Sequence, residues 1–378
     1  MNVSLVYPPF HLESLYSLPP LGLINLATGL GLAGHRPTIH DAVLELREGT
    51  LPMGPGLYQA CAERILDASP GLVAFSAQCT TYPAMIGVAR ELKRRDPDVC
   101  IVAGGHNASF VDTRTLERFP EFDAVVRGEG EITFNECVDA LAAGRPISAI
   151  FGVTGRRDGA IVRAPDRELV ARLDDLPRPD YSLAPDLARY ARAYDLPRTI
   201  AILEVGRGCP HACVYCSESA MWRRRTRVFS AARLVSEMRR LRDTDGADCF
   251  LLAYDQFTAD RDFVRRFCTA VLDEGLSGCG WYCISRLDTV DAELFALMRR
   301  AGCESMCYGI DSGSKRTLSF INKHIDETLL YQRVRETTEH GMNPTLSFII
   351  GFPEEEREDI DATLVLALKC GIQGNVNP

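Results

Sequence analysis

Apolar positions along the first 145 residues alternate between short continuous runs and helical spacing. The short runs lie at residues 3–7, 38–40, 71–76, 99–103 and 123–126. The segments with helical spacing lie at residues 21–34, 83–95 and 130–143. This order predicts a Rossmann-like or flavodoxin-like doubly wound parallel sheet of five strands, in a domain that spans residues 1–145. Sheets of this kind bind ligands beyond the carboxyl ends of their strands.

Residues 146–198 interrupt the alternation. Prolines accumulate in this stretch, among them those at positions 165, 177, 179, 185 and 197, and residues 174–180 have the composition of turns. The segment is therefore predicted to be an ordered linker between two domains.

From residue 199 the alternation returns with a period near 40 residues. Strands are predicted at residues 200–205, 249–254, 280–284, 304–310 and 345–350. Helices are predicted at residues 230–243, 260–274, 291–301, 326–340 and 359–370. Repeated units of this kind predict a (β/α) barrel over residues 199–378, with functional groups at the carboxyl ends of its strands. About five units fit, so we expect the last unit to be incomplete, or its strand to lie in residues 371–378.

Composition narrows the class of protein. Apolar residues make up 46% of the 378 residues and charged residues 25%, as in globular proteins. The net charge of −9 argues against nucleic acid as a partner, because phosphate binding needs a basic surface. We find no run of 18 apolar residues and no signal-peptide pattern. The 14 cysteines are then expected to be reduced thiols in a cytoplasmic protein that does not bind membranes.

Three cysteines carry the strongest chemical signal. Cys209, Cys213 and Cys216 have Cys-x3-Cys-x2-Cys spacing on a loop that follows a predicted strand. Thiolates are soft ligands for iron–sulfur clusters, zinc or copper. Three of them can hold three corners of a 4Fe-4S cluster and leave one iron open for chemistry. A structural zinc site is the alternative, but it needs a fourth ligand, and the only nearby candidate, His211, is badly placed inside the loop.

This motif, with aromatic Tyr215 before the third cysteine, resembles the signature of the radical S-adenosylmethionine (radical SAM) superfamily. The resemblance implies that the open iron chelates SAM, and that an electron from the cluster cleaves SAM to a 5′-deoxyadenosyl radical. It also implies that the barrel is a partial (β/α)6 radical SAM barrel, with Cys209, Cys213 and Cys216 as catalytic metal ligands.

Further motifs resemble the cobalamin-binding class of radical SAM enzymes. They are residues 17–27, 34–35, 104–106, 126–131 and 173–180. The resemblance and the strand-end glycines together imply that cobalamin contacts Ser76, Thr80, Gly104, Gly105, His106, Gly128 and Glu129. The alternative is that the glycines merely shape turns. No histidine has an aspartate two positions before it, so an Asp-x-His-x-x-Gly ligand to cobalt is not expected.

The resemblance also implies a SAM site at the carboxyl ends of the barrel strands. Its residues are Tyr215, Asp255, Arg286, Asp311, Ser312, Gly351 and Glu354. Asp255 matches an acidic position that could accept from the SAM ammonium, and Arg286 matches an arginine that could pair with the SAM carboxylate. Asp311 lies in the ribose-contacting element, where glutamate is commoner.

Two other clusters remain open. Cys279 and Cys283 share one face of a predicted strand, and Cys303 and Cys307 share one face of the next strand. The four thiols would lie at two levels about 13 Å apart along the strands, which is too far for one cluster. Buried thiols are therefore favoured over a second cluster. The arginines of residues 223–227 form either a solvated patch or a contact for an anionic substrate or cofactor tail.

The combined prediction is a cobalamin-dependent radical SAM C-methyltransferase that acts on an unactivated carbon of a small molecule or natural-product intermediate. A flavodoxin or ferredoxin is the expected electron donor. The alternatives are a cobalamin-binding radical SAM enzyme of non-methylating cyclisation, ring contraction or oxidation, and a non-catalytic cofactor-binding protein.

Overall fold

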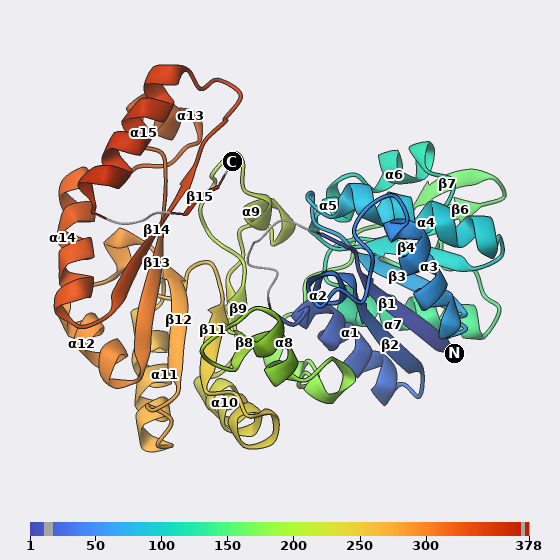
Figure 1. The fold of residues 1–378 in the computed structure, drawn as a ribbon, viewed down its shortest axis with the longest axis horizontal. Helices are drawn as coiled ribbons and strands as arrows, with labels where there is room; N and C mark the ends of the chain where they lie inside the picture. The colour runs from blue at the N-terminus through green and yellow to red at the C-terminus, as the bar shows by residue number, and fades with distance from the viewer. Residues whose placement is uncertain (11–17, 372–374, 378) are drawn as a thin grey trace. The chain divides into compact units, whose positions relative to one another are not determined.

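The computed structural model describes residues 1–10, 18–371 and 375–377, and side chains only up to residue 371 (Figure 1). Residue 17, the first of the 17–27 motif, therefore lies outside the described residues. The chain divides into two compact units, Met1–Pro197 and Arg198–Pro378. Among the described residues, no helix has the length and hydropathy needed to cross a membrane.

The first unit is built on a sheet with strand order β2-β1-β3-β4-β5-β6-β7. Its parallel strands are β1 (Asn2–Tyr7), β2 (Arg36–Asp41), β3 (Leu72–Ser76), β4 (Cys100–Gly104) and β5 (Ala124–Val126). These are the five predicted strands, so the doubly wound sheet is confirmed.

A hairpin extends this sheet beyond the prediction. β6 (Val153–Arg157) pairs antiparallel with β5, and β7 (Ala160–Arg163) pairs antiparallel with β6. The prolines of residues 146–198 lead to the prediction of a linker, and that prediction does not include these two strands. The overlooked signal is the Asp158–Gly159 turn, whose φ angles of +50° and +78° suit a two-residue hairpin loop. The arginines of β6 and β7 hide the usual alternation of apolar residues.

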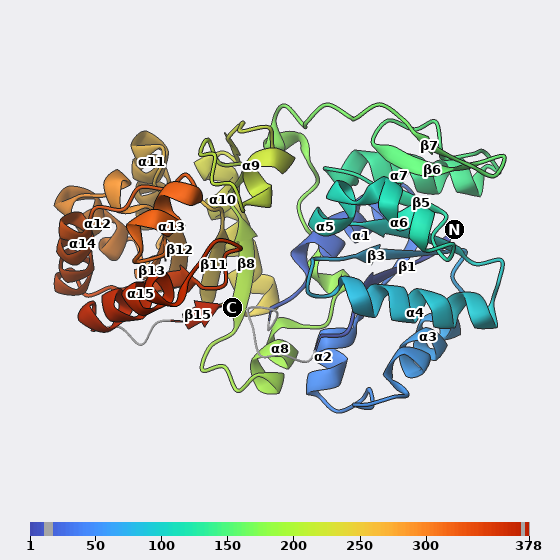
Figure 2. The ribbon, with the colours of Figure 1, turned by 90° about the horizontal axis from the view of Figure 1, so that it is seen from above.

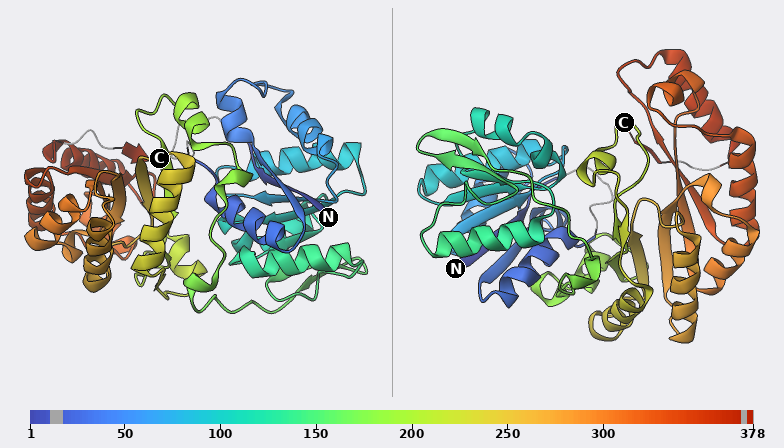
Figure 3. Two further views of the ribbon diagram at one scale, coloured as in Figure 1. Left: turned by 90° about the horizontal axis from the view of Figure 1, so that it is seen from below. Right: turned by 180° about the vertical axis from the view of Figure 1, so that it is seen from behind.

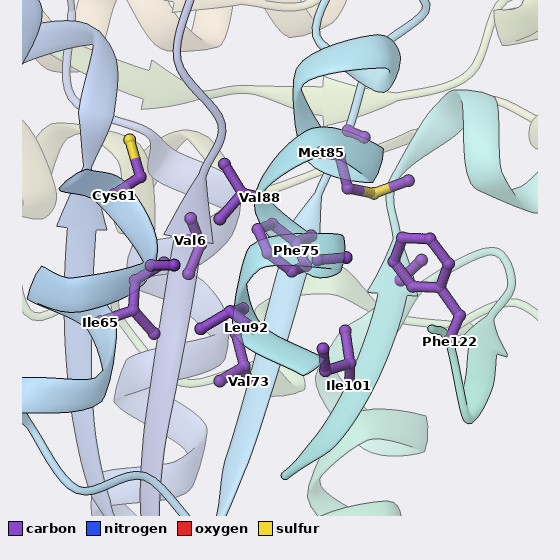
Figure 4. Packing of buried hydrophobic residues seen from close by; sticks show 14 of the residues in the cluster. Val6, Cys61, Ile65, Val73, Phe75, Met85, Val88, Leu92, Ile101 and Phe122 are labelled. Carbon is purple, nitrogen blue, oxygen red and sulfur yellow. The ribbon is translucent and has the colours of Figure 1, made fainter. Parts of the chain in front are cut away.

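Helices cover both faces of the sheet, and each face buries its own apolar core. On one face α3 (Leu57–Asp67) packs beside α4 (Tyr82–Arg95), and on the other α1 (Leu21–Leu32) packs beside α7 (Gly130–Ala142) (Figure 2). Figure 4 shows side chains of the first core, where Phe75 and Val73 meet Met85 and Leu92. The shorter helices are α2 (Ala42–Arg47), α5 (His106–Phe110), α6 (Asp112–Arg118) and α8 (Leu187–Ala193), with 3-10 turns at Leu173–Asp175 and Tyr181–Leu183.

The second unit is a parallel sheet with strand order β15-β14-β13-β12-β11-β8. The strands are β8 (Ile200–Glu204), β11 (Cys249–Ala253), β12 (Gly280–Ser285), β13 (Cys303–Asp311), β14 (Asn343–Ile349) and β15 (Asn375–Asn377). The order follows the chain, as in a partial (β/α)6 barrel, which confirms the predicted fold. β15 lies within residues 371–378, one of the two expectations for the final unit.

The helices of this unit form one layer outside the sheet (Figure 3). They are α10 (Ala231–Asp245), α11 (Arg261–Asp273), α12 (Ala292–Arg300), α14 (Glu327–Glu339) and α15 (Arg357–Lys369). Short α9 (Ser217–Met221) begins directly after Cys216, short α13 (Lys315–Phe320) follows β13, and a 3-10 turn spans Leu287–Thr289. Trp281 of β12 points into this layer, where its ring contacts Phe257 and Phe267. Helix-facing strand residues are buried, while alternate residues such as Ile202 and Leu251 are half-buried.

Candidate active site

The loop that carries the three cysteines is anchored at its base. β9 (Gly206–Arg207) precedes it and pairs antiparallel with β10 (Arg227–Val228), which follows α9. Gly208 has φ +94°, and a Cβ there would collide with the carbonyl of Arg225. The Arg207 guanidinium pairs with Glu204 at 2.7 Å and lies over the ring of Trp222. These contacts fix where the loop leaves the strand, so Gly208 cannot be replaced without moving it.

The three thiols lie on one loop and differ in burial. Cys209 is buried and Cys213 and Cys216 are half-buried, and the Cys216 amide donates to the Cys213 carbonyl at 3.1 Å. Burial raises the pKa of Cys209, and Asp255, Cys216 and Cys213 raise it further. In the described part of the chain, no three or more His, Cys, Asp or Glu residues form a group that could hold a metal ion. Three cysteines on one loop are nevertheless the donor set that would hold a 4Fe-4S cluster by three of its irons.

Asp255 and Arg286 both lie near these thiols. Burial raises the pKa of Cys216 as it does that of Cys209, and the Asp255 charge adds to both shifts. Arg286 pairs with Asp288 through contacts of 2.9 and 3.0 Å. Asp288 raises the pKa of Arg286 most, and Cys213 and Cys209 also contribute. The Arg286 charge is therefore balanced by Asp288.

Asp311 joins the cysteine loop to the barrel. It ends β13 in a left-handed conformation, with φ +67°, and is buried. Its Oδ2 atom accepts from the Tyr215 hydroxyl at 2.6 Å and from Lys323 Nζ at 2.5 Å. The Tyr215 ring also makes an edge contact with Phe352, 5.5 Å between centroids. Lys323 is absent from the sequence prediction because no motif marks it; its site is assembled only by the fold.

Three other predicted SAM residues lie in different surroundings. Ser312 is fully buried, and its hydroxyl bonds to Thr363 of α15 at 3.0 Å. Gly351, with φ +92°, donates its amide to Glu355 at 2.6 Å and has open space where a side chain would start. Glu354 is exposed. Glu355, which the sequence analysis does not single out, is the acidic residue that holds the Gly351 turn.

The predicted cobalamin residues gather at strand ends of the first unit. Ser76 ends β3, Gly104 ends β4, and Gly128 follows β5 with φ +72°. Gly105 has φ +91°, and a Cβ there would lie 2.8 Å from the Ala77 carbonyl oxygen. Space is open at Gly128, whose amide donates to Ser109 at 3.1 Å. The glycines thus leave strand ends free of side chains, which suits the approach of a large ligand.

The other predicted cobalamin residues, Thr80, His106 and Glu129, differ from one another in exposure and contacts. Thr80 is exposed in the loop after β3, and half-buried His106 begins α5. The Glu129 carboxylate accepts from the Val170 amide at 2.6 Å and so holds the segment that follows the hairpin.

Most of the barrel cysteines are buried: Cys279, Cys283 and Cys303 are buried and Cys307 is half-buried. Burial raises the pKa of Cys303 well above its usual range, and neighbouring Cys283 adds to the effect. Burial also raises the pKa of Cys268 on α11 and of Cys279. These surroundings agree with the buried-thiol interpretation.

Comparison with known proteins identifies the class. The Radical SAM superfamily matches residues 203–367, and the B12 binding domain matches residues 11–138. An uncharacterized methyltransferase of Pyrococcus horikoshii is 32% identical over 378 residues, which cover 98% of this chain and 79% of that protein. An anaerobic magnesium-protoporphyrin IX monomethyl ester cyclase of Synechocystis is 28% identical, over 90% of this chain and 66% of the cyclase.

A solved structure shares the fold. The radical SAM methyltransferase TsrM from Kitasatospora setae, with cobalamin and a 4Fe-4S cluster bound, has a TM-score of 0.79 at 20% identity, over 99% of this chain and 74% of TsrM. The chain belongs to the radical SAM superfamily, in the class that carries a B12 binding domain. It is an enzyme whose cofactors are a 4Fe-4S cluster, SAM and cobalamin, as predicted.

Proposed function

We propose that the protein is a cobalamin-dependent radical SAM C-methyltransferase acting on an unactivated carbon of a small molecule, such as a natural-product intermediate. The carrying observation is that Cys209, Cys213 and Cys216 lie on one loop after β8, and that Tyr215 of this loop donates its hydroxyl to Asp311 at the end of β13 at 2.6 Å. Methyltransferases among the relatives support the methylation. They include a hopanoid C-3 methylase of Methylococcus capsulatus, 27% identical over 95% of this chain and 66% of that protein, and TokK of Streptomyces tokunonensis, 30% identical over 51% of this chain.

Within this proposal the three cysteines hold the cluster, which supplies the electron for SAM cleavage. Asp255 accepts from the SAM ammonium, and Arg286 donates to its carboxylate while Asp288 keeps the guanidinium oriented. Tyr215, Asp311, Ser312, Gly351 and Glu354 complete the proposed SAM site. The Ser312 hydroxyl is already bonded to Thr363 at 3.0 Å.

Cobalamin supplies the methyl-carrying chemistry when it is bound. We assign its binding to Ser76, Thr80, Gly104, Gly105, His106, Gly128 and Glu129. The open space at Gly128 and the side-chain-free Gly105 turn support this assignment.

The proposed partners are the small-molecule substrate and an external electron donor of the flavodoxin or ferredoxin type, without nucleic acid or membrane. Half-exposed Cys213 and Cys216 support reduction from outside, because short distances to the surface favour electron transfer. The 14 unpaired cysteines support a cytoplasmic location.

Anaerobic reconstitution with iron, sulfide and hydroxocobalamin, followed by reductant and SAM, tests the function. We expect 5′-deoxyadenosine, S-adenosylhomocysteine and methylcobalamin, quantified by mass spectrometry. Cys213→Ala should abolish 5′-deoxyadenosine formation, whereas Cys307→Ser, a barrel thiol outside the loop, should preserve it. A reduced, cluster-loaded protein that leaves SAM intact would contradict the proposal.

The second candidate is a non-methylating radical reaction, favoured by the likeness to the Synechocystis cyclase. It predicts 5′-deoxyadenosine with bound cobalamin that is never methylated. The same assay therefore separates the two functions.

A further inference from the structure

The segment that follows α13 contacts the cysteine loop at successive positions. We call residues 321–323 the strap. The Ile321 carbonyl accepts from the Val214 amide at 3.1 Å, and the Asn322 side-chain amide donates to the Ala212 carbonyl at 3.1 Å. Both loop residues lie between predicted cluster ligands, so the strap holds the backbone of the loop at two points.

The strap itself is rigidly placed. Ile321 is fully buried in a small apolar cluster with Leu318 and Phe352. Asn322 adopts a left-handed conformation with φ +57°, and the Lys323 amide returns to the Leu318 carbonyl at 2.9 Å. This is the geometry that ends a helix with bonded terminal carbonyls. The loop is therefore held against a fixed support.

Lys323 adds a third connection through a side-chain relay. Its ammonium and the Tyr215 hydroxyl share one oxygen of Asp311, at 2.5 and 2.6 Å. The Lys323 side chain is 10% exposed and that of Asp311 is 4% exposed. Removal of one partner of so buried a pair leaves an uncompensated charge. Tyr215 lies between Cys213 and Cys216, so the relay ends inside the ligand motif.

We propose that Lys323 is a positioning residue for the cluster loop, which acts through Asp311 to fix Tyr215 while Ile321 and Asn322 hold the loop backbone. The proposal rests on the proposed role of the three cysteines as cluster ligands. It assigns Lys323 a second, electrostatic effect: its charge offsets Asp311 next to the loop. Without the ammonium, the Asp311 charge disfavours the added electron and lowers the reduction potential of the cluster.

The test uses the full chain, reconstituted anaerobically, with Lys323→Met, Lys323→Arg and the double variant Asp311→Asn/Lys323→Met. Lys315→Met is the matched control, because Lys315 is exposed on neighbouring α13. Redox titration followed by electron paramagnetic resonance should give a lower potential for Lys323→Met. The potential should return toward the wild-type value in Lys323→Arg and in the double variant, which restore charge balance. Lys315→Met should match the wild type.

Two variants address the loop contacts without changing charge. Tyr215→Phe should alter the resonance spectrum of the reduced cluster, because the hydroxyl that reaches Asp311 is gone. Asn322→Ala should speed removal of iron by a chelator about fivefold, the size expected for one lost hydrogen bond. An unchanged potential in Lys323→Met would overturn the electrostatic effect, and an unchanged spectrum in Tyr215→Phe would overturn the positioning role. Tyr215→Phe keeps the inference testable if Lys323→Met folds poorly.

Failure of the underlying function has a different signature. If Cys213→Ala retains as much iron per chain as the wild type, the cysteines are not the cluster ligands and the proposed function is wrong. If Cys213→Ala loses iron while the strap variants behave as the wild type, only the role of Lys323 is wrong.

Discussion

His40 and Asp41 are adjacent titratable residues at the end of β2 with opposite pKa shifts. Burial, with a smaller contribution from Arg64, lowers the pKa of His40 to about 4. Burial raises the pKa of Asp41 to about 6, although Leu44, Tyr190 and Val43 donate hydrogen bonds to it. Between pH 4 and 6 the folded protein therefore keeps His40 neutral and Asp41 protonated, opposite to the unfolded chain.

The two residues should have cancelling effects on stability. The unfolded chain binds a proton at His40 that the folded protein does not, so His40 makes stability rise with pH between about 4 and 6.5. Asp41 makes stability fall as the pH rises from about 4 to 6, since only its folded form stays protonated. Each shift of about two pKa units is worth about 3 kcal/mol. In the wild type, the pair should therefore contribute little to the change of stability with pH.

Single variants should reveal how each residue makes stability depend on pH. Asp41→Asn should leave stability that increases by up to about 3 kcal/mol from pH 4 to 6.5, and His40→Gln should leave stability that decreases from pH 4 to 6. Hydrogen exchange of peptides spanning residues 36–47, measured in the full chain and corrected for intrinsic rates, reports the local stability. Equal slopes in both variants would contradict the assignment.

At the scale of helices and loops, Gly313 is a point of close packing. A Cβ at this position would lie 2.5 Å from the Ala362 carbonyl oxygen and 2.9 Å from Thr363 Cα, both backbone atoms of α15. Gly313→Ala should therefore destabilise the protein by about 1–3 kcal/mol, because neither element can give way cheaply. Gly31→Ala in α1, where nothing lies within 4 Å, should stabilise it by about 0.5–1 kcal/mol. Chemical denaturation of both variants checks the opposite signs.

The β6–β7 hairpin depends on Arg127. This buried guanidinium donates to Asp166 at 2.8 Å and to the Ala164 carbonyl at 2.6 Å, and it lies 3.5 Å from buried Asp112. Arg127→Met removes these buried hydrogen bonds, while Asp112 keeps its contact with Arg163 at 3.1 Å, so we expect a loss of about 1–3 kcal/mol. Arg157→Met, on the same hairpin, removes an exposed pair with Asp158 and should cost less than about 1 kcal/mol. Similar losses in both variants would show that the pair at Arg127 adds nothing.

Elements with regular apolar spacing could be predicted from the sequence, and irregular ones could not. The parallel strands of both sheets follow from buried apolar runs, whereas the arginine-rich hairpin lacks that pattern. In the site, the cysteine loop is local in sequence and was found by its spacing. Lys323, Thr363 and Glu355 take part in the site through contacts that only the fold creates. Lys323 bonds to Asp311, 12 residues away in the sequence, and Thr363 bonds to Ser312, 51 residues away. Glu355 accepts from the Gly351 amide.

Across the whole molecule, the cysteine motif and the strand-end glycines lie in different compact units. Each unit has its own core, and the residues assigned to each cofactor lie within one unit. The two cofactors should therefore be lost independently of one another. A protein whose units fold separately should retain one cofactor when the site for the other is damaged.

Two substitutions in the full chain test this independence. Cys213→Ala should lose most of its iron and keep cobalamin. Gly105→Ala should lose most of its cobalamin and keep iron, because its Cβ meets the Ala77 backbone and its φ is +91°. Gly246→Ala is the control: Gly246 also has a positive φ, +69°, but its surroundings are open and it ends α10, so both cofactors should remain. Iron by elemental analysis and cobalamin by absorbance after desalting are the measurements. Joint loss of both cofactors in either site variant would mean that the two sites form one cooperative structure.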